Sequence, residues 1–212
     1  MRAAALVAMT AVCLTALVGN AAAKDWTDPA GRITFTTPAA WTMDNHNDAT
    51  MTYLVVGTAN NECQFLAIPR AETASASASA VHRAAGNPIS AAAWVGVANG
   101  MTRLFNNQAT LISQTVDTGG FWPIQRAEFS GPDHPLIHGA IQIRPGAEIW
   151  AFCLTYDGAD PLATYETVIH SVATPQDAAL QAASEQEDAA RAAAPAAPAA
   201  PAGHQTPPPA HH

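Results

Sequence analysis

Residues 148–156 are the segment that most restricts how this chain can fold. They read as a strand whose apolar residues fall on both faces, Ile149, Ala151 and Cys153 on one and Trp150, Phe152, Leu154 and Tyr156 on the other. Successive side chains of a strand point to opposite faces, and a strand that is apolar on both is normally covered on both sides. The segment therefore predicts a central strand with a helical layer on each face of its sheet.

Other segments with β-type patterns supply the rest of this sheet. They are residues 32–36, 41–43, 51–56, 63–68, 111–118, 122–129 and 136–144. Helical spacing of apolar residues predicts two helices, one after the cap Asn87 to about residue 105 and one after the cap Asp160 to residue 172. Residues 71–85 are rich in Ser and Ala and fit either a loop or a weak helix. We expect a single α+β domain over residues 24–174, a mostly antiparallel sheet with helices packed on both faces (an α/β/α sandwich).

The two ends of the chain differ from this domain in composition. Residues 1–23 start with Arg2, continue as an apolar run and end in three alanines, a pattern typical of a signal peptide cleaved after Ala23. The alternative is a retained anchor, although a membrane span needs about 20 apolar residues. Residues 175–194 predict an Ala-rich polar helix, and residues 195–212, rich in Ala and Pro, a disordered tail. We expect a periplasmic or secreted protein without a membrane span once the signal is removed.

The cysteines agree with export. Cys13 would leave with the signal peptide, and the mature chain keeps Cys63 and Cys153, each within an apolar, strand-like segment. A pair of buried cysteines in an oxidising compartment predicts a disulfide. It would close a loop of about 90 residues, worth roughly 4 to 5 kcal/mol in the chain-entropy model. The alternative is two buried free thiols.

The charge balance excludes two classes of partner. The chain has 9 Lys and Arg against 17 Asp and Glu, for a net charge of −8, and the signal peptide would remove one more basic residue. Binding to nucleic acid depends on clustered positive charge that releases counterions, and anionic membranes attract basic segments. We therefore expect neither nucleic acid nor an anionic lipid surface as a partner.

Two motifs relate the chain to a known family. RITFTTPAAW, residues 32–41, would carry a first strand through a proline and small residues to a buried tryptophan. Near the other end, strand 149–156 leads into YETVIHSV, residues 165–172. In these motifs and in the order of its elements, the chain resembles the PsbP-like family over about residues 25–174. That resemblance implies an antiparallel sheet flanked by helices, usually without enzymatic activity. The family's partner-binding residues cannot be placed on this sequence.

Two clusters are candidates for function. Asp133, His134 and His138 are the densest set of metal-type ligands in the domain. On a strand, however, the four-residue offset between the histidines separates their rings by about 13 Å, too far for one metal ion. We therefore expect solvated loop and strand histidines there. Phe121 and Trp122 follow Gly119-Gly120 at a tight turn, where they form either a partner contact or a plug at the end of the sheet.

No catalytic constellation emerges, so we expect no catalytic residues, no cofactor and no bound metal. The leading hypothesis is an exported, non-catalytic binding or accessory protein of the bacterial cell envelope, with another envelope protein or macromolecule as partner. One alternative is an exported metal-dependent hydrolase that uses Asp133, His134 and His138. Another is a carrier that holds a small apolar molecule in a pocket near Trp94, Met101 and Trp150.

Overall fold

The strand with two apolar faces, β9 (Ala147–Thr155), is the middle strand of a seven-stranded antiparallel sheet. The strand order is β3-β4-β5-β9-β8-β7-β6. Their bounds are Thr42–Asn45 (β3), Thr52–Gly57 (β4), Asn61–Pro69 (β5), Thr110–Asp117 (β6), Ile124–Ser130 (β7) and Ile137–Arg144 (β8). The computed structural model describes residues 23–194, so residues 1–22 of the predicted signal peptide and the predicted tail lie outside the described residues.

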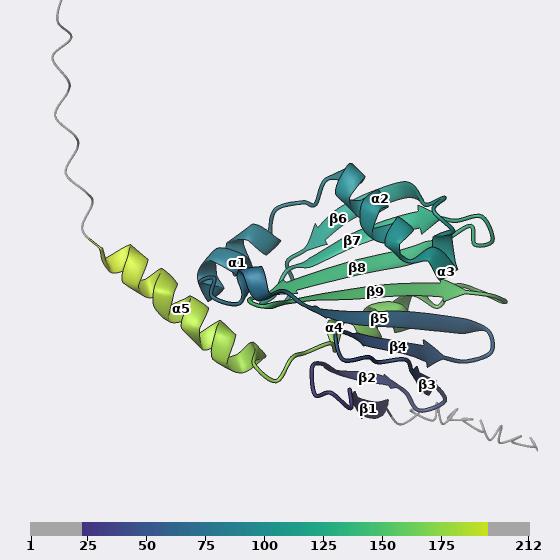
Figure 1. The fold of residues 1–212 in the computed structure, drawn as a ribbon, viewed down its shortest axis with the longest axis horizontal. Helices are drawn as coiled ribbons and strands as arrows, with labels where there is room; N and C mark the ends of the chain where they lie inside the picture. Colours follow the sequence, from purple (N-terminus) through teal and green to yellow (C-terminus); the bar gives the residue numbers. More distant parts are fainter. Residues whose placement is uncertain (1–22, 195–212) are drawn as a thin grey trace, which may run out of the picture.

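Both faces of the sheet are covered, as the two apolar faces of β9 predict (Figure 1). On one face, which we call the α4 face, helix α4 (Leu162–His170) packs with a two-stranded sheet of β1 (Ala23–Thr27) and β2 (Thr34–Pro38). On the other, the α2 face, lie α2 (Ala91–Gly100) and α3 (Thr102–Phe105). Ile149 and Ala151 belong to the first core, and Phe152 and Leu154 to the second. The expected α+β sandwich, a mostly antiparallel sheet covered on both faces, is confirmed.

The predicted disulfide joins the two halves of this sheet. Cys63 on β5 and Cys153 on β9 lie directly opposite each other, and both are fully buried. The pairing of β5 with β9 is also the only place where the strands of residues 42–69 meet those of residues 110–155 in the described sheet. We call the paired strands β5 and β9 the seam of the sheet, and the disulfide joins these two strands.

The N-terminal strand takes a different place from the one its pattern indicates. β2 does not enter the large sheet, and it pairs instead with β1, a segment for which no strand was predicted. Its backbone is also held by α4, because Ser171 Oγ accepts from the N–H of Thr36 at 2.8 Å and Thr34 forms a bridge with Ala173. Phe35 points inward and stacks on Phe65 of β5. β2 thus lies beside α4 in the layer that covers the α4 face of the large sheet.

Two predicted helix caps were wrong, because tertiary contacts occupy the residues concerned. α2 begins after Ser90, whose hydroxyl accepts from the N–H of Ala93, and the segment before it is held outside the helix by the amide of Gln125. The carboxylate of Asp160 does not cap α4, since it binds the ring of His138 at 2.7 Å.

The uncertain segment 71–85 contains a 3-10 turn (Ala71–Thr73) and a helix, α1 (Ala78–Ala85). The polar C-terminal helix, α5 (Asp177–Ala193), packs along α1. Its Glu187 accepts from the N–H of Ser79 at 3.1 Å and from the hydroxyl of Ser77, at the start of α1. Within residues 23–194 no helix is long and apolar enough to cross a membrane.

Candidate functional site

The α4 face changes from apolar to charged on the side of β6. Ile124 of β7 still belongs to the core, but Arg126 and Glu128 follow it on the same face at the two-residue spacing of a strand. α4 forms one wall of the resulting groove, whose volume is about 220 Å³. We call it the polar groove. The polar residues that line it are Ser113, Thr115, Arg126, Glu128, His138 and Glu166, and we include the charged residues that contact them at its two ends, Asp117, Asp160 and His170.

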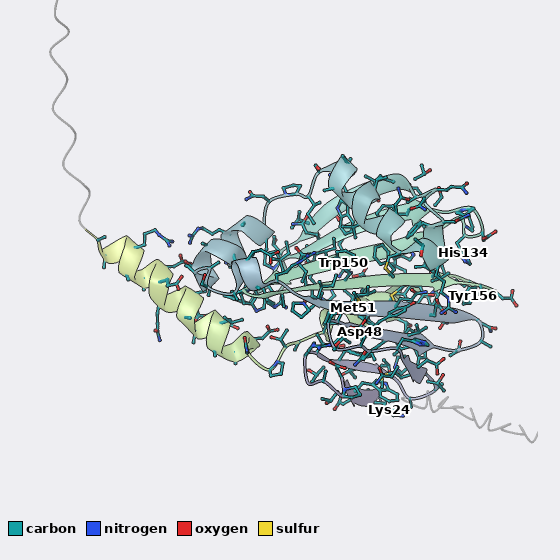
Figure 2. All side chains as sticks on the ribbon, in the orientation of Figure 1. Lys24, Asp48, Met51, His134, Trp150 and Tyr156 are labelled. Carbon is teal, nitrogen blue, oxygen red and sulfur yellow. A yellow bond between two sulfur atoms is a disulfide. The ribbon has the colours of Figure 1, made fainter. Side chains whose placement is uncertain are left out.

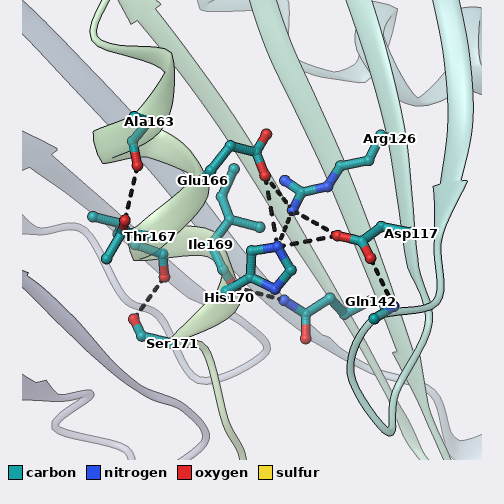
Figure 3. A network of polar contacts seen from close by, with 11 residues as sticks. Asp117, Arg126, Gln142, Ala163, Glu166, Thr167, Ile169, His170 and Ser171 are labelled. Atoms are coloured by element: carbon teal, nitrogen blue, oxygen red, sulfur yellow. Dashed lines mark hydrogen bonds and ion pairs between the residues drawn. The ribbon is translucent and has the colours of Figure 1, made fainter.

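At one end of the polar groove, Arg126 is surrounded by three ligand-type side chains (Figure 3). Its Nη2 lies 2.5 Å from Glu166 Oε2, 3.1 Å from His170 Nε2 and 3.5 Å from Asp117 Oδ2. His170 Nε2 is also 3.0 Å from Asp117 Oδ2. The N–H of Gly119 donates to Asp117 at 2.8 Å and, with His170 and Arg126, lowers the pKa of that carboxyl below its usual value. Strand and helix thus hold these charges in a fixed arrangement.

Asp117, Glu166 and His170 are also the one group of three or more metal-type ligands among the residues that the structure describes. Their ligand atoms all lie within 4.8 Å of one another, and two carboxylates with a histidine suit a divalent transition metal. However, the guanidinium of Arg126 already supplies a positive charge at the centre of the group. In this arrangement the chain's own cation partly neutralises the cluster and occupies its centre.

At the other end of the groove, His138 connects two further carboxylates. Its Nε2 lies 2.7 Å from Asp160 Oδ2, and its Nδ1 lies 3.9 Å from Glu128 Oε1. The residue is only 6 % exposed, so the expectation of a solvated strand histidine was wrong. The physical reason is the start of α4, which brings Asp160 and the ring of Tyr165 over β8. Burial raises the pKa of Tyr165 to about 12, and its hydroxyl donates to the carbonyl of Leu154.

The predicted set of Asp133, His134 and His138 does not assemble. Asp133 and His134 line another open cleft at the end of the sheet, which Asp160 also borders, and the His134 ring lies 5.4 Å from that of Tyr156 (Figure 2). His138 points into the polar groove and is held there by Asp160. His134 lies beside Tyr156 and His138 lies beside Asp160 in the groove, so the two histidines proposed for a hydrolase do not face one common site.

The Phe121-Trp122 turn is divided between two environments. Trp122 is 7 % exposed and lies under the guanidinium of Arg144, whose central carbon is 4.5 Å from the ring centroid. Phe121 is half-buried and stacks on His82 of α1 at 4.6 Å. Trp122 thus fills the end of the sheet, whereas a partner contact through Phe121 stays a prediction.

The space considered for an apolar ligand is occupied by side chains around Trp94. This residue is fully buried, and its ring lies 5.8 Å from that of Phe129. Met101 borders a small cleft with Leu66 at the edge of the same layer, and Trp150 is packed against the α2-face core.

Sequence reasoning missed Asp117, Arg126, Glu166 and His170, four of the residues that define the groove. Two local signals were present: Arg126 and Glu128 alternate with apolar residues in a strand, and Glu166 and His170 lie four apart on one helix face. Neither signal shows that the strand and the helix would meet.

The fold and the groove together define a single-domain α+β protein with a seven-stranded antiparallel sheet and a charged site on one face. Cyanobacterial PsbP (CyanoP) from Synechocystis sp. PCC 6803 is similar in structure, with 14 % identity and a TM-score of 0.48, over 74 % of this chain and 95 % of that one. A protein from Bacteroides thetaiotaomicron is similar at 12 % identity and a TM-score of 0.41, over 73 % of this chain and 49 % of that one. No protein-family model and no curated protein sequence matches the chain. The likenesses are at the level of the fold.

Proposed function

We propose that this protein is an exported, non-catalytic binding protein of the bacterial cell envelope that holds another macromolecule at its polar groove. The observation that carries the proposal is the pairing of charges within the groove. Arg126 is held by Glu166, and His138 by Asp160, on a face of the sheet whose centre is an apolar core. Charges fixed in this way suit recognition, because they give a partner a preset electrostatic pattern.

Two further observations support export. The Cys63–Cys153 disulfide lies in the seam of the sheet, and disulfides persist in oxidising compartments. Residues 1–23 have the composition of a signal peptide. Mass spectrometry of the protein recovered from the periplasm or medium should find Lys24 as the first residue. A protein that keeps residues 1–23 and fractionates with membranes would contradict export.

The binding role is tested by photo-crosslinking in the intact envelope. A photoreactive amino acid replaces Ser113 or Thr115, both exposed on the groove side of β6, and the matched control replaces Asp44, exposed on β3 at the opposite edge of the sheet. We expect the same discrete adduct from both groove positions and none from the control. Adducts absent from the groove positions, or equal at all three, would contradict the proposal.

Elemental analysis separates this function from the metal-dependent hydrolase. The hydrolase requires a stoichiometric metal in the natively purified protein that is lost on His134→Ala. We expect this variant to leave the metal content and the crosslinked adduct unchanged. A metal lost together with His134 would favour the enzyme.

A further inference from the structure

β6 is the last strand at one edge of the large sheet, and α2 packs against it on one face (Figure 1). It has eight residues, and β7 is its only neighbouring strand within residues 23–194. The opposite edge, β3, has only four residues. An edge strand presents unpaired N–H and C=O groups along its outer side, and proteins usually protect such edges with Lys, Pro or a covering element. β6 contains neither Lys nor Pro, and its middle residues, 112–115, are exposed.

An exposed apolar side chain lies at this edge. Ile112 is 54 % exposed, more than any other large hydrophobic residue that the structure describes. The register shift between Leu111 and Ser113 leaves Ile112 without a partner on β7. Bulges often re-aim a side chain at the margin of a sheet. Ile112 therefore offers an anchor to a segment that lies beside β6.

The charge next to β6 identifies the kind of segment. The polar groove contains the carboxylates of Asp117, Glu128, Asp160 and Glu166 against the single guanidinium of Arg126. The four carboxylates therefore outweigh the one guanidinium, and the groove has an excess of acidic side chains. A strand added to β6 would place every second side chain on the α4 face, beside Ser113, Thr115 and Asp117. Lysine or arginine at those positions would meet the excess of carboxylates.

We propose that β6 binds an extended, lysine- or arginine-containing segment of another protein, which adds an eighth strand to the sheet. The main-chain hydrogen bonds along the edge give affinity, and the groove selects cationic side chains. This inference rests on the proposed binding function and names its partner class. In this proposal the residues of the groove share one role, which is to recognise every second side chain of the added strand.

Binding of fluorescein-labelled peptides to the mature protein tests the proposal. The probe is an alternating Lys-Val peptide, and its two matched controls are a Glu-Val peptide and the Lys-Val peptide N-methylated at every peptide bond. N-methylation keeps the charge but removes the N–H donors, including those that would face β6. We expect fluorescence anisotropy to show binding of the first peptide only, with affinity lower by about tenfold or more after N-methylation. Equal binding of the N-methylated peptide, or binding of the Glu-Val peptide, would overturn strand addition.

Two variants locate the binding on the protein. Ile112→Lys removes the apolar anchor and places a positive charge on the edge strand. Glu128→Gln removes one carboxylate from the groove. Both substitutions should lower the affinity for the Lys-Val peptide. Asp44→Asn removes a carboxylate from β3 at the opposite edge of the sheet and should leave the affinity for the peptide unchanged. Amide hydrogen exchange should slow within residues 110–117 when the peptide binds. Peptide binding without this protection would overturn the proposal.

The outcome is distinguishable from failure of the proposed function. If Ser113 and Thr115 still crosslink to one partner but Ile112→Lys does not affect that adduct, the groove binds a partner and strand addition is wrong. If the peptide binds but the groove positions give no adduct in the envelope, the envelope role fails instead. A concentration-dependent dimer that Ile112→Lys dissociates would assign the edge to a second copy of the chain and overturn the peptide proposal.

Discussion

At the scale of single residues, Arg126 determines what the charged end of the groove can hold. Arg126→Ala removes the guanidinium from among Asp117, Glu166 and His170. Because Arg126 is 12 % exposed, we expect its loss to destabilise the protein by about 1–3 kcal/mol through the loss of its charge-assisted hydrogen bonds to Glu166 and Asp117. The same change leaves two carboxylates and a histidine free to bind zinc. Zinc should therefore raise the thermal unfolding midpoint of the variant but not of the parent protein.

The control for this prediction is Arg126→Ala combined with His170→Ala. It keeps every histidine outside the groove, so any zinc binding elsewhere on the chain remains in the comparison. We expect the double variant to lose the zinc response. A zinc-dependent rise of equal size in the parent protein would mean that Arg126 does not exclude the metal.

The groove also shows which residues could be predicted from the sequence. The alternation of residues 136–144 is enough to place His138 on the face of β8 opposite Ile137 and Ile141, which belong to the α2-face core. The burial of His138 was not predictable, because it depends on Asp160, which lies 22 residues away and at the start of another element. The Cys63–Cys153 pair was predictable since the chain has only two cysteines after the signal peptide.

At the scale of elements, local signals located most strands and helices but not their partners. The two-faced pattern of residues 148–156 identified β9 as central, because that pattern depends only on the strand itself. β2 has an equally clear alternating pattern, yet it pairs with β1 outside the large sheet. A strand's own sequence does not distinguish the two sheets, and only packing against α4 and β5 does.

The docking of α5 on α1 gives a prediction at the same scale. Hydrogen bonds from Ser77 and Ser79 lower the pKa of Glu187 to about 2, from an ordinary value of 4.5. A carboxyl whose pKa is lowered by folding stabilises the docked helix above the ordinary pKa, and this contribution is lost as the pH falls through the lowered one. We therefore expect amide exchange in residues 177–193 to be constant from neutral pH to about pH 5, once corrected for intrinsic rates, and protection to fall between 4.5 and 2.

Glu187→Gln should speed exchange of α5 at neutral pH and reduce its dependence on pH. Glu185→Gln is the matched control, because Glu185 accepts only from Gln181 on the same helix and makes no hydrogen bond to α1. Equal effects of the two substitutions would show that α5 is held by its packing and by Arg83–Asp188, rather than by the cap that Glu187 provides.

At the scale of the whole molecule, stability depends on the seam between β5 and β9. The strands of residues 42–69 and those of residues 110–155 meet there, and Cys63–Cys153 crosses it. Both cysteines are fully buried, so a thiolate reaches the sulfurs only when the seam opens. We expect reduction by dithiothreitol without denaturant to proceed at the rate of global unfolding and to become independent of reductant concentration once the reductant is in excess.

The reduced protein should be less stable by roughly 4 to 5 kcal/mol, since the bond closes a loop with a sequence separation of 90. Urea unfolding of the oxidised and reduced forms at the same pH measures this difference as a shift of the midpoint. Rapid reduction in native buffer, with a rate proportional to dithiothreitol, would mean that the seam opens locally while the rest of the sheet stays folded. In that case the two halves would be separate folding units, and the sheet would depend on β5 and β9 much less than its strand order indicates.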